Sequence, residues 1–186
     1  MTSVLKVSEI QDPTNNNSAI TINSSGFVTM PQNPKIYSIF RNTTNLTANG
    51  VITAWEVPDD AMAATNIGAT FTHSSGLWQF PVTGVYKVVH TAGIRNTSGD
   101  SLTAAALWGT TDNGSNYHRL SYQACGAGSS NNEDGHLYGE VLVNISNTST
   151  HKVEYRAESM GASSILYGNS GYNRTSISFE WMAPAQ

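Results

Sequence analysis

The sequence predicts an all-β fold of the sandwich or barrel type. Short segments of alternating apolar and polar residues recur along the whole chain, at the spacing of sandwich strands. Clusters rich in Asn, Ser and Gly separate these segments, and Asn, Ser and Thr make up roughly a third of all residues, far above ordinary usage. Helical periodicity is almost absent: its best candidate, Asp59–Asn66, covers only about two turns between Pro58 and Gly68, so we expect a loop there.

Two prolines divide the predicted strands into two groups. Pro31 and Pro34 cannot donate to a sheet ladder, so we place a boundary near residue 34, between an N-terminal β segment (1–34) and a larger domain (35–186). The strands expected in the N-terminal segment are Leu5–Ile10, Ala19–Ile22 and Phe27–Met30. Those expected in the larger domain are Ile36–Arg41, Val51–Glu56, Ala69–His73, Leu77–Phe80, Gly84–Ile94, Leu102–Thr110, Tyr117–Ala124, His136–Asn144, His151–Glu158, Ser164–Tyr167 and Thr175–Met182. Gly84–Ile94 is partly apolar on both faces, which indicates a central strand.

The composition argues against several classes of partner. Charged residues make up 12% of the chain, the formal net charge is −4, and the 9 Lys and Arg residues form no cluster. Nucleic acid is therefore not an expected partner, since phosphate recognition needs a concentrated basic surface. No apolar stretch approaches the ~20 residues of a membrane span, and no secretory signal follows Met1. Cys125 is the single cysteine, so no intrachain disulfide is expected, and we interpret it as a packing residue.

The sequence predicts neither catalysis nor a cofactor. The 5 His residues lack zinc-binding spacing, and we expect His90, at an alternating strand position, to lie in a core or an interface. The adjacent acids Asp59–Asp60 and Glu133–Asp134 lie in predicted loops, and neighbours along a chain do not by themselves form the carboxylate pair of a glycosidase. No metal site is predicted; a calcium loop at Asn131–Asp134 is the weaker alternative to a solvated loop, and a chelator-reversible rise in melting temperature would reveal it.

The stretch Gly76–Tyr86, GLWQFPVTGVY, is the most informative in the chain. A proline belongs at a strand end and a glycine permits a corner that a side chain would block. The stretch resembles the signature of the complement-component-one-q and tumour necrosis factor head superfamily, in which an aromatic strand leads through a Pro/Gly corner into Gly-x-Tyr. The residues that match are Phe71, Trp78, Phe80, Pro81, Gly84 and Tyr86. The resemblance implies a jelly-roll β-sandwich over about residues 35–186, whose closing strand lies near the first. Val88 and His90 depart from it, since the family usually has aromatics there.

The same resemblance implies a homotrimer. The larger domain holds more aromatic residues than one small core needs, and aromatics with polar tips are favoured at subunit contacts. The candidates for the interface are Trp55, Trp108, Tyr122, Tyr138 and Trp181. For each of them taken singly, a place in the core is the simpler interpretation.

The N-terminal segment resembles a different group of proteins. Residues 4–31, which begin LKVSEIQDPTNNN and continue SAITINSSGFVTMP, are similar to short modules at the start of tail-fibre and other structural proteins of marine bacteriophages. The resemblance implies a virion protein, assembled in the host cytoplasm, whose residues 1–34 dock on another virion protein. A hairpin plus one strand is marginal in isolation, which also favours docking.

Three functional hypotheses follow. In the first, the protein is a trimeric fibre or spike whose outward loops, Asn96–Asp100, Asp112–Asn116 and Gly126–Gly135, bind a host surface glycan or protein, since Asn, Ser, Gly and Tyr suit adaptable polar recognition. The candidate binding residues are Asn96, Asp100, Asn113, Asn116, Asn131, Asn132, Glu133 and Asp134. The alternative is a capsid decoration, head-fibre or tail-junction protein with a purely structural role. A cytokine-like soluble ligand is disfavoured by the missing signal peptide and by the phage-like segment.

Overall fold

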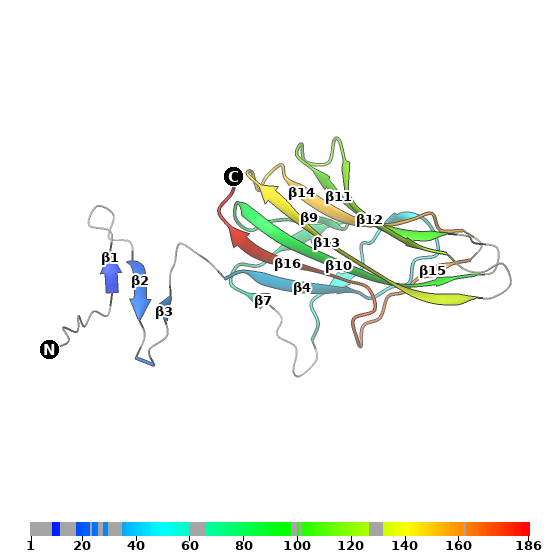
Figure 1. The fold of residues 1–186 in the computed structure, drawn as a ribbon, viewed down its shortest axis with the longest axis horizontal. Coiled ribbons are helices and arrows are strands. Elements are labelled where there is room, and N and C mark those ends of the chain that lie inside the picture. The colour runs from blue at the N-terminus through cyan, green and yellow to red at the C-terminus, as the bar shows by residue number, and fades with distance from the viewer. Residues whose placement is uncertain are drawn as a thin grey trace. The chain divides into compact units, whose positions relative to one another are not determined.

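The protein is built from β-strands in two compact units (Figure 1). The computed structural model describes residues 9–11, 18–22, 24–25, 28–29, 35–59, 66–97, 100, 102–126, 132–161 and 163–186. Every regular element in these residues is a strand, which confirms the predicted all-β fold. No helix among them is long and apolar enough to span a membrane. The units are Met1–Lys35 and Ile36–Gln186, which puts the boundary one residue beyond the one that the prolines suggest.

The N-terminal unit contains a three-stranded antiparallel sheet. Its strands are β1 (Glu9–Gln11), β2 (Ser18–Ile22) and β3 (Val28–Thr29), in that order. The β2–β3 hairpin matches the predicted one, with Ile22 opposite Val28 and a turn at Ser24–Ser25. Most of the predicted first strand lies outside the described residues.

The larger unit, the head, consists of two antiparallel sheets that face each other (Figure 1). The first, here the β10 sheet, has the order β13 (Glu133–Ile145), β10 (Gly84–Asn96), β16 (Ser176–Ala183), β4 (Tyr37–Asn42) and β6 (Trp55–Glu56), with β15 (Ile165–Leu166) on β10 and β7 (Asn66–Ile67) on β4. The second, the β11 sheet, has the order β12 (His118–Cys125), β11 (Thr103–Thr110), β14 (Lys152–Glu158), β9 (Leu77–Gln79) and β8 (Thr72–Ser74), with β5 (Gly50–Val51) on β14. The closing strand β16 pairs with the opening strand β4, as the jelly-roll resemblance implies.

Several predicted strands differ from the structure in their bounds, and one of them is divided between the two sheets. The segment predicted as one strand, Val51–Glu56, forms β5 in one sheet and β6 in the other. The chain changes sheets at its centre: Ile52 N donates to Tyr155 O of the β11 sheet, whereas Ala54 O accepts from Thr43 N beside the β10 sheet. The strand predicted to begin at Ala69 is β8, which begins at Thr72. The short strand β7 lies where the sequence predicts no strand. Residues 60–65 of the expected Asp59–Asn66 loop lie outside the described residues.

The core is a cluster of aromatic rings at the centre of the sandwich. Along β10, buried and half-buried residues alternate from Gly84 to Ala92, so that every second side chain enters the core. Four residues of the signature stretch and its surroundings, Phe71, Trp78, Phe80 and Tyr86, are almost completely buried. Their rings contact each other and Phe179 of the closing strand. These aromatics therefore join the two sheets.

The corner between β9 and β10 depends on Gly84. A Cβ atom at this position would lie 2.1 Å from the indole Nε1 of Trp181 and 2.8 Å from the carbonyl oxygen of Ala183. The same indole Nε1 donates to Thr83 O at 3.3 Å. The hydroxyl of Tyr86 donates to Val82 O at 2.9 Å and closes the corner from inside. The glycine is thus required by the close approach of β16.

Gly84→Ala is expected to destabilise the head by about 1–3 kcal/mol, the usual cost of overpacking a closely packed site. The new methyl group must displace both an indole and a backbone carbonyl, so the shift cannot be confined to one flexible side chain. The matched control is Gly50→Ala in β5, where a Cβ atom meets nothing within 4 Å. Urea unfolding of both variants at one protein concentration tests this. Equal unfolding midpoints for the two would contradict it.

Candidate interaction surfaces

Two of the predicted loop residues are buried and hold the structure together. Asn96 is the last residue of β10 and is fully buried, with its Nδ2 donating to the carbonyl oxygen and Sγ of Cys125. The carboxylate of Asp100 accepts from Thr103 Oγ1 at 3.1 Å and from Gly161 N at 3.0 Å. Burial raises the pKa of Asp100, but the hydrogen bonds that it accepts outweigh burial and lower it. Neither side chain is displayed for binding, contrary to the sequence-based expectation.

The turn between β11 and β12 is exposed, as expected, and is internally braced. Asp112 accepts from Asn116 N at 2.9 Å and from Asn116 Nδ2 at 2.6 Å, and also from Thr110 Oγ1. These bonds, chiefly those from Asn116, lower the pKa of Asp112 to about 2. Asn113 adopts a left-handed backbone conformation with φ of 59°. The two predicted residues Asn113 and Asn116 therefore belong to a rigid, solvent-facing turn.

The predicted acidic loop is partly strand. Asn131 lies outside the described residues, Asn132 is exposed, and Glu133 and Asp134 begin β13. Asp134 forms a two-point ion pair with Arg95, at 2.8 and 3.0 Å, which lowers the pKa of Asp134. Within the described residues no group of three or more His, Cys, Asp or Glu side chains gathers as metal ligands.

The five predicted interface aromatics do not form one surface. Trp55 belongs to the core, where its Nε1 donates to Ile52 O at 2.7 Å. Trp181 is half-buried at the Gly84 corner. Tyr138 is exposed on the outer face of the β10 sheet, whereas Trp108 and Tyr122 lie on the outer face of the β11 sheet. Sequence alone could not assign these positions, because the choice depends on the pairing register.

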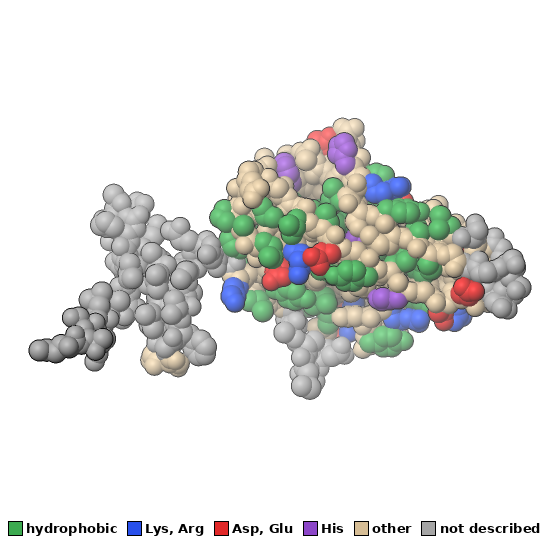
Figure 2. Space-filling view, in the orientation of Figure 1, with side chains coloured by type: hydrophobic (Ala, Val, Ile, Leu, Met, Phe, Trp, Pro, Cys, Tyr) green, Lys and Arg blue, Asp and Glu red, His purple; other side chains and the backbone are tan. Residues whose placement is uncertain are grey.

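The outer face of the β10 sheet, here the apolar face, exposes large hydrophobic side chains. Leu142, Tyr138 and Met182 are exposed by 62%, 58% and 51%. Figure 2 shows hydrophobic side chains spread over the visible face of the head, with charged side chains gathered in a few places. One exposed ion pair, Lys87–Glu180 at 3.6 Å, lies across β10 and β16. Glu140, which accepts from the Tyr138 hydroxyl at 2.9 Å, lies between Tyr138 and Leu142 on β13, so the exposed hydrophobic side chains of this face are interspersed with charged ones.

The outer face of the β11 sheet carries a ladder of alternating aromatic and arginine side chains, here the Arg–aromatic cluster. The guanidinium of Arg119 lies 4.7 Å from the ring of Tyr122 and 4.9 Å from that of Trp108. The guanidinium of Arg156 lies 4.8 Å from Trp108 and 4.7 Å from Tyr117. Each contact is within cation–π distance.

Two glutamates neutralise this ladder. Glu158 accepts from Trp108 Nε1 at 2.5 Å and from Arg119 Nη2 at 2.8 Å. Glu154 pairs with Arg156 Nε in the same strand, β14. Burial, together with the charge of Glu154, raises the pKa of the nearby Tyr117. Sequence reasoning named only Trp108 and Tyr122 of this cluster.

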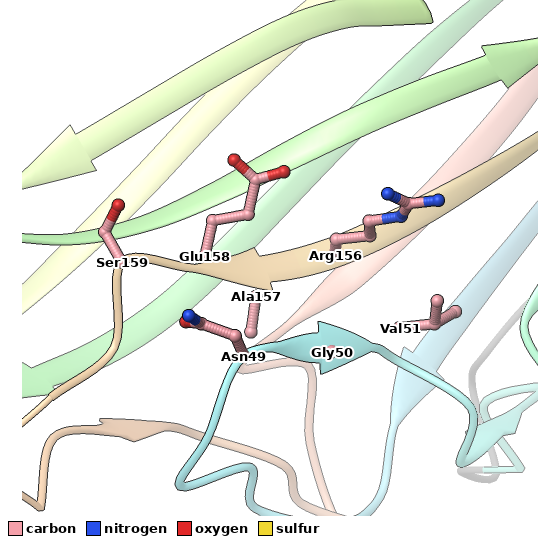
Figure 3. A pocket seen from close by; sticks show the side chains of 7 residues that line it. All are labelled: Asn49, Gly50, Val51, Arg156, Ala157, Glu158 and Ser159. Carbon is pink, nitrogen blue, oxygen red and sulfur yellow. The ribbon is translucent and has the colours of Figure 1, made fainter. Parts of the chain in front are cut away.

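A hollow of about 520 Å³ opens beside the cluster (Figure 3). The residues that line it are Asn49, Gly50, Val51, Arg156, Ala157, Glu158 and Ser159. Arg156 and Glu158 extend to the same side of β14, as alternate residues of a strand must. The hollow therefore shares two charged side chains with the Arg–aromatic cluster.

Comparison with known proteins identifies the fold through similar solved structures. No family model and no curated protein matches the sequence. The structure resembles an Eiger TNF from S. frugiperda, with a TM-score of 0.59 and 13% identity over 82% of this chain and 96% of that one. It also resembles murine APRIL, solved at pH 5.0 and at pH 8.0, with a TM-score of 0.57 and 8% identity over 80% of this chain and 99% of that one. The chain therefore has the jelly-roll fold of tumour necrosis factor-like proteins.

Proposed function

We propose that the protein is a structural protein of a bacteriophage particle, whose head trimerises and attaches the particle to its host. The resemblance of residues 4–31 to phage structural modules supports the virion role. Those residues would then dock on another virion protein. The tumour necrosis factor-like fold of the head is compatible with trimerisation about one sheet face.

The apolar face of the β10 sheet is the observation that carries the trimer. Leu142, Tyr138 and Met182 would be half or more solvent-exposed in a monomer. Around them the sheet presents Thr91 and Ser176, whose hydroxyls bond to each other at 2.8 Å, and the paired charges of Lys87 and Glu180. Hydroxyls whose hydrogen bonds are already satisfied allow close approach of a partner without leaving unpaired polar groups. A second and third copy of the chain would cover this face.

Leu142→Arg is expected to convert trimers to monomers, because each subunit contact would then bury an unpaired charge. Size-exclusion chromatography with light scattering measures this directly, with the wild type expected at three times the chain mass. The matched control is Tyr172→Arg, at a side chain of similar exposure (55%) in the 168–173 loop, which is expected to leave the mass unchanged. A wild-type monomer at micromolar concentration would refute the trimer.

The position of the protein on the particle tests the virion role. Imaging of whole particles identifies which virion protein contacts residues 1–34, and separates a fibre or spike from a capsid decoration. Attachment itself is tested by competition: the purified full chain is expected to reduce adsorption of the phage to its host. Absence from the particle would contradict the proposal outright.

A further inference from the structure

We propose that the Arg–aromatic cluster and the adjoining hollow form a binding site for a neutral oligosaccharide. This inference names a ligand class for the attachment role and rests on that proposed function. It also moves the binding site from the loops at the strand ends to the face of the β11 sheet.

The side chains of the cluster are held in place before any ligand arrives. Ala106 of β11 pairs with Tyr122 on one side and with Arg156 on the other. It points away from the core, which takes Ala105 and Leu107, and yet it is completely buried. The long side chains of its neighbours therefore lie flat across the sheet and cover it. Cation–π contacts and ion pairs then fix their planar groups, which lowers the entropy lost on binding.

The charge of the site fits a neutral ligand. Arg119 and Arg156 are balanced by Glu154 and Glu158, so the cluster has no net charge to attract an anion or a cation. A guanidinium has five N–H donors and a carboxylate about four acceptor positions, so the ion pairs leave capacity on both. Adjacent hydroxyls of a sugar are donors and acceptors at once, and hydrogen bonds to charged groups are the stronger kind.

The hollow gives the ligand a place of suitable size. Its volume of about 520 Å³ lies in the usual range for small-molecule sites. Arg156 and Glu158 supply a donor and an acceptor at one side, and Asn49 and Ser159 add an amide and a hydroxyl (Figure 3). Asn49 Oδ1 accepts from Met160 N at 2.8 Å, which fixes the orientation of that amide. The hollow is thus lined by four polar side chains, two of which also belong to the cluster.

A protein partner fits this surface less well. Protein interfaces need an apolar centre that becomes fully dry. Of the three rings in the cluster only Tyr122 is exposed by more than a third, at 39%, while Trp108 and Tyr117 are half-buried beside guanidinium groups. The surface therefore offers fixed polar groups with one partly exposed aromatic ring, a combination that suits a pyranose ring with its hydroxyls.

The test uses the full chain on an array of neutral and carboxylate-bearing oligosaccharides, followed by calorimetry with the best neutral ligand. Wild type is expected to bind neutral members. Arg156→Gln and Glu158→Gln are each expected to weaken binding at least about tenfold, the usual effect of losing a hydrogen bond to a charged group. The matched control is Arg174→Gln, because Arg174 also lies over an aromatic ring, 3.5 Å from the centroid of Tyr167, but outside the cluster. Melting temperature and light scattering confirm that each variant keeps the wild-type fold and mass.

The outcomes separate the site from the attachment role. Binding of acidic members alone, binding of none, or equal binding by all the variants would overturn the inference. If wild type blocks phage adsorption and both cluster variants block it equally well, attachment stands and the oligosaccharide site falls. If neutral oligosaccharides bind through the cluster and adsorption is unaffected by the protein, the site stands and the attachment role falls. Adsorption that is lost after protease treatment of the host, and not after periodate, would point to a protein receptor and against this site.

Discussion

Trp78→Ala is expected to lower the free energy of unfolding of the head by about 4 kcal/mol, within the range for removing a buried aromatic ring. The indole is fully buried at the junction of the two sheets. Its ring centroid lies 4.4 Å from that of Phe40 and 5.3 Å from that of Phe179, both in the β10 sheet. Truncation would leave a cavity that rigid strands on both sides cannot fill. Urea unfolding followed by circular dichroism measures the loss as a lower midpoint with an unchanged slope.

Trp78→Phe tests how much of this loss a smaller aromatic ring can prevent at the same site. The indole Nε1 has no hydrogen-bond partner among the described residues, so its removal costs no bond and relieves a buried, unpaired donor. We expect this variant to lose less than half as much stability as Trp78→Ala. A loss below about 1 kcal/mol for Trp78→Ala would show that the aromatic cluster is not the centre of the core.

Acid is expected to destabilise the head through His90. This histidine is fully buried in β10, and burial lowers its pKa from 6.5 to about 4. The unfolded chain therefore takes up a proton below about pH 6.5, whereas the folded head takes it up only near pH 4. The unfolded state binds more protons in this pH window. The contribution of His90 to the free energy of unfolding is therefore fully present above pH 6.5 and is lost as the pH falls from 6.5 to 4. The full loss is about 3 kcal/mol, from 1.36 kcal/mol for each unit of pKa difference.

The surroundings of His90 explain why the proton is rejected. Neither ring nitrogen has a hydrogen-bond partner among the described residues. The neighbours are neutral: the ring of Tyr155 lies 4.8 Å away, and Gly139 opposite leaves room for the imidazole and for the amide of Gln123. Burial also lowers the pKa of the half-buried His73, so His73 contributes in the same direction. Carboxylates with lowered pKa values, such as Asp112, also stabilise the folded head, but protonation removes that stabilisation only at more acidic pH.

His90→Leu is expected to flatten the stability profile between pH 7.5 and 4.5 and to leave stability at pH 7.5 nearly unchanged. Denaturant midpoints at a series of pH values measure this. His118→Gln, at an exposed position of β12, is the control and should retain the wild-type pH dependence. If His90→Leu loses stability with acid as steeply as wild type, another group is responsible.

The strand pattern of the head could be predicted because local signals agree with it. Gly84–Ile94 was expected to be central, and β10 indeed pairs with β13, β16 and β15. The predicted end of this strand is wrong, however: β10 continues to Asn96, although the Asn-Thr-Ser-Gly sequence that begins there predicts a loop. At Val51–Glu56 the alternation is real, but a change of sheet in its centre leaves no trace in the residue pattern.

The Arg–aromatic cluster could not be predicted, because it depends on register between distant segments. A bulge between Leu107 and Trp108 shifts the register between β11 and β12 and places Trp108 opposite Arg119. Before and after the bulge the two strands pair regularly. The polar residues 152, 154, 156 and 158 alternate visibly in the sequence and indicate one outward face of β14. Nothing in the sequence says which aromatic ring lies beside that face, since only the folded sheet brings β12, β11 and β14 together.

The pairing of the closing strand with the opening strand makes the head a candidate for circular permutation. Trp181 N donates to Ile36 O, and Gln186 exchanges hydrogen bonds with Asn144, so the chain enters and leaves the head at the same end. The end of β16 and the start of β4 meet there, so a short linker can join them without crossing a sheet. A cargo fused after Gln186 would start from this end of the head.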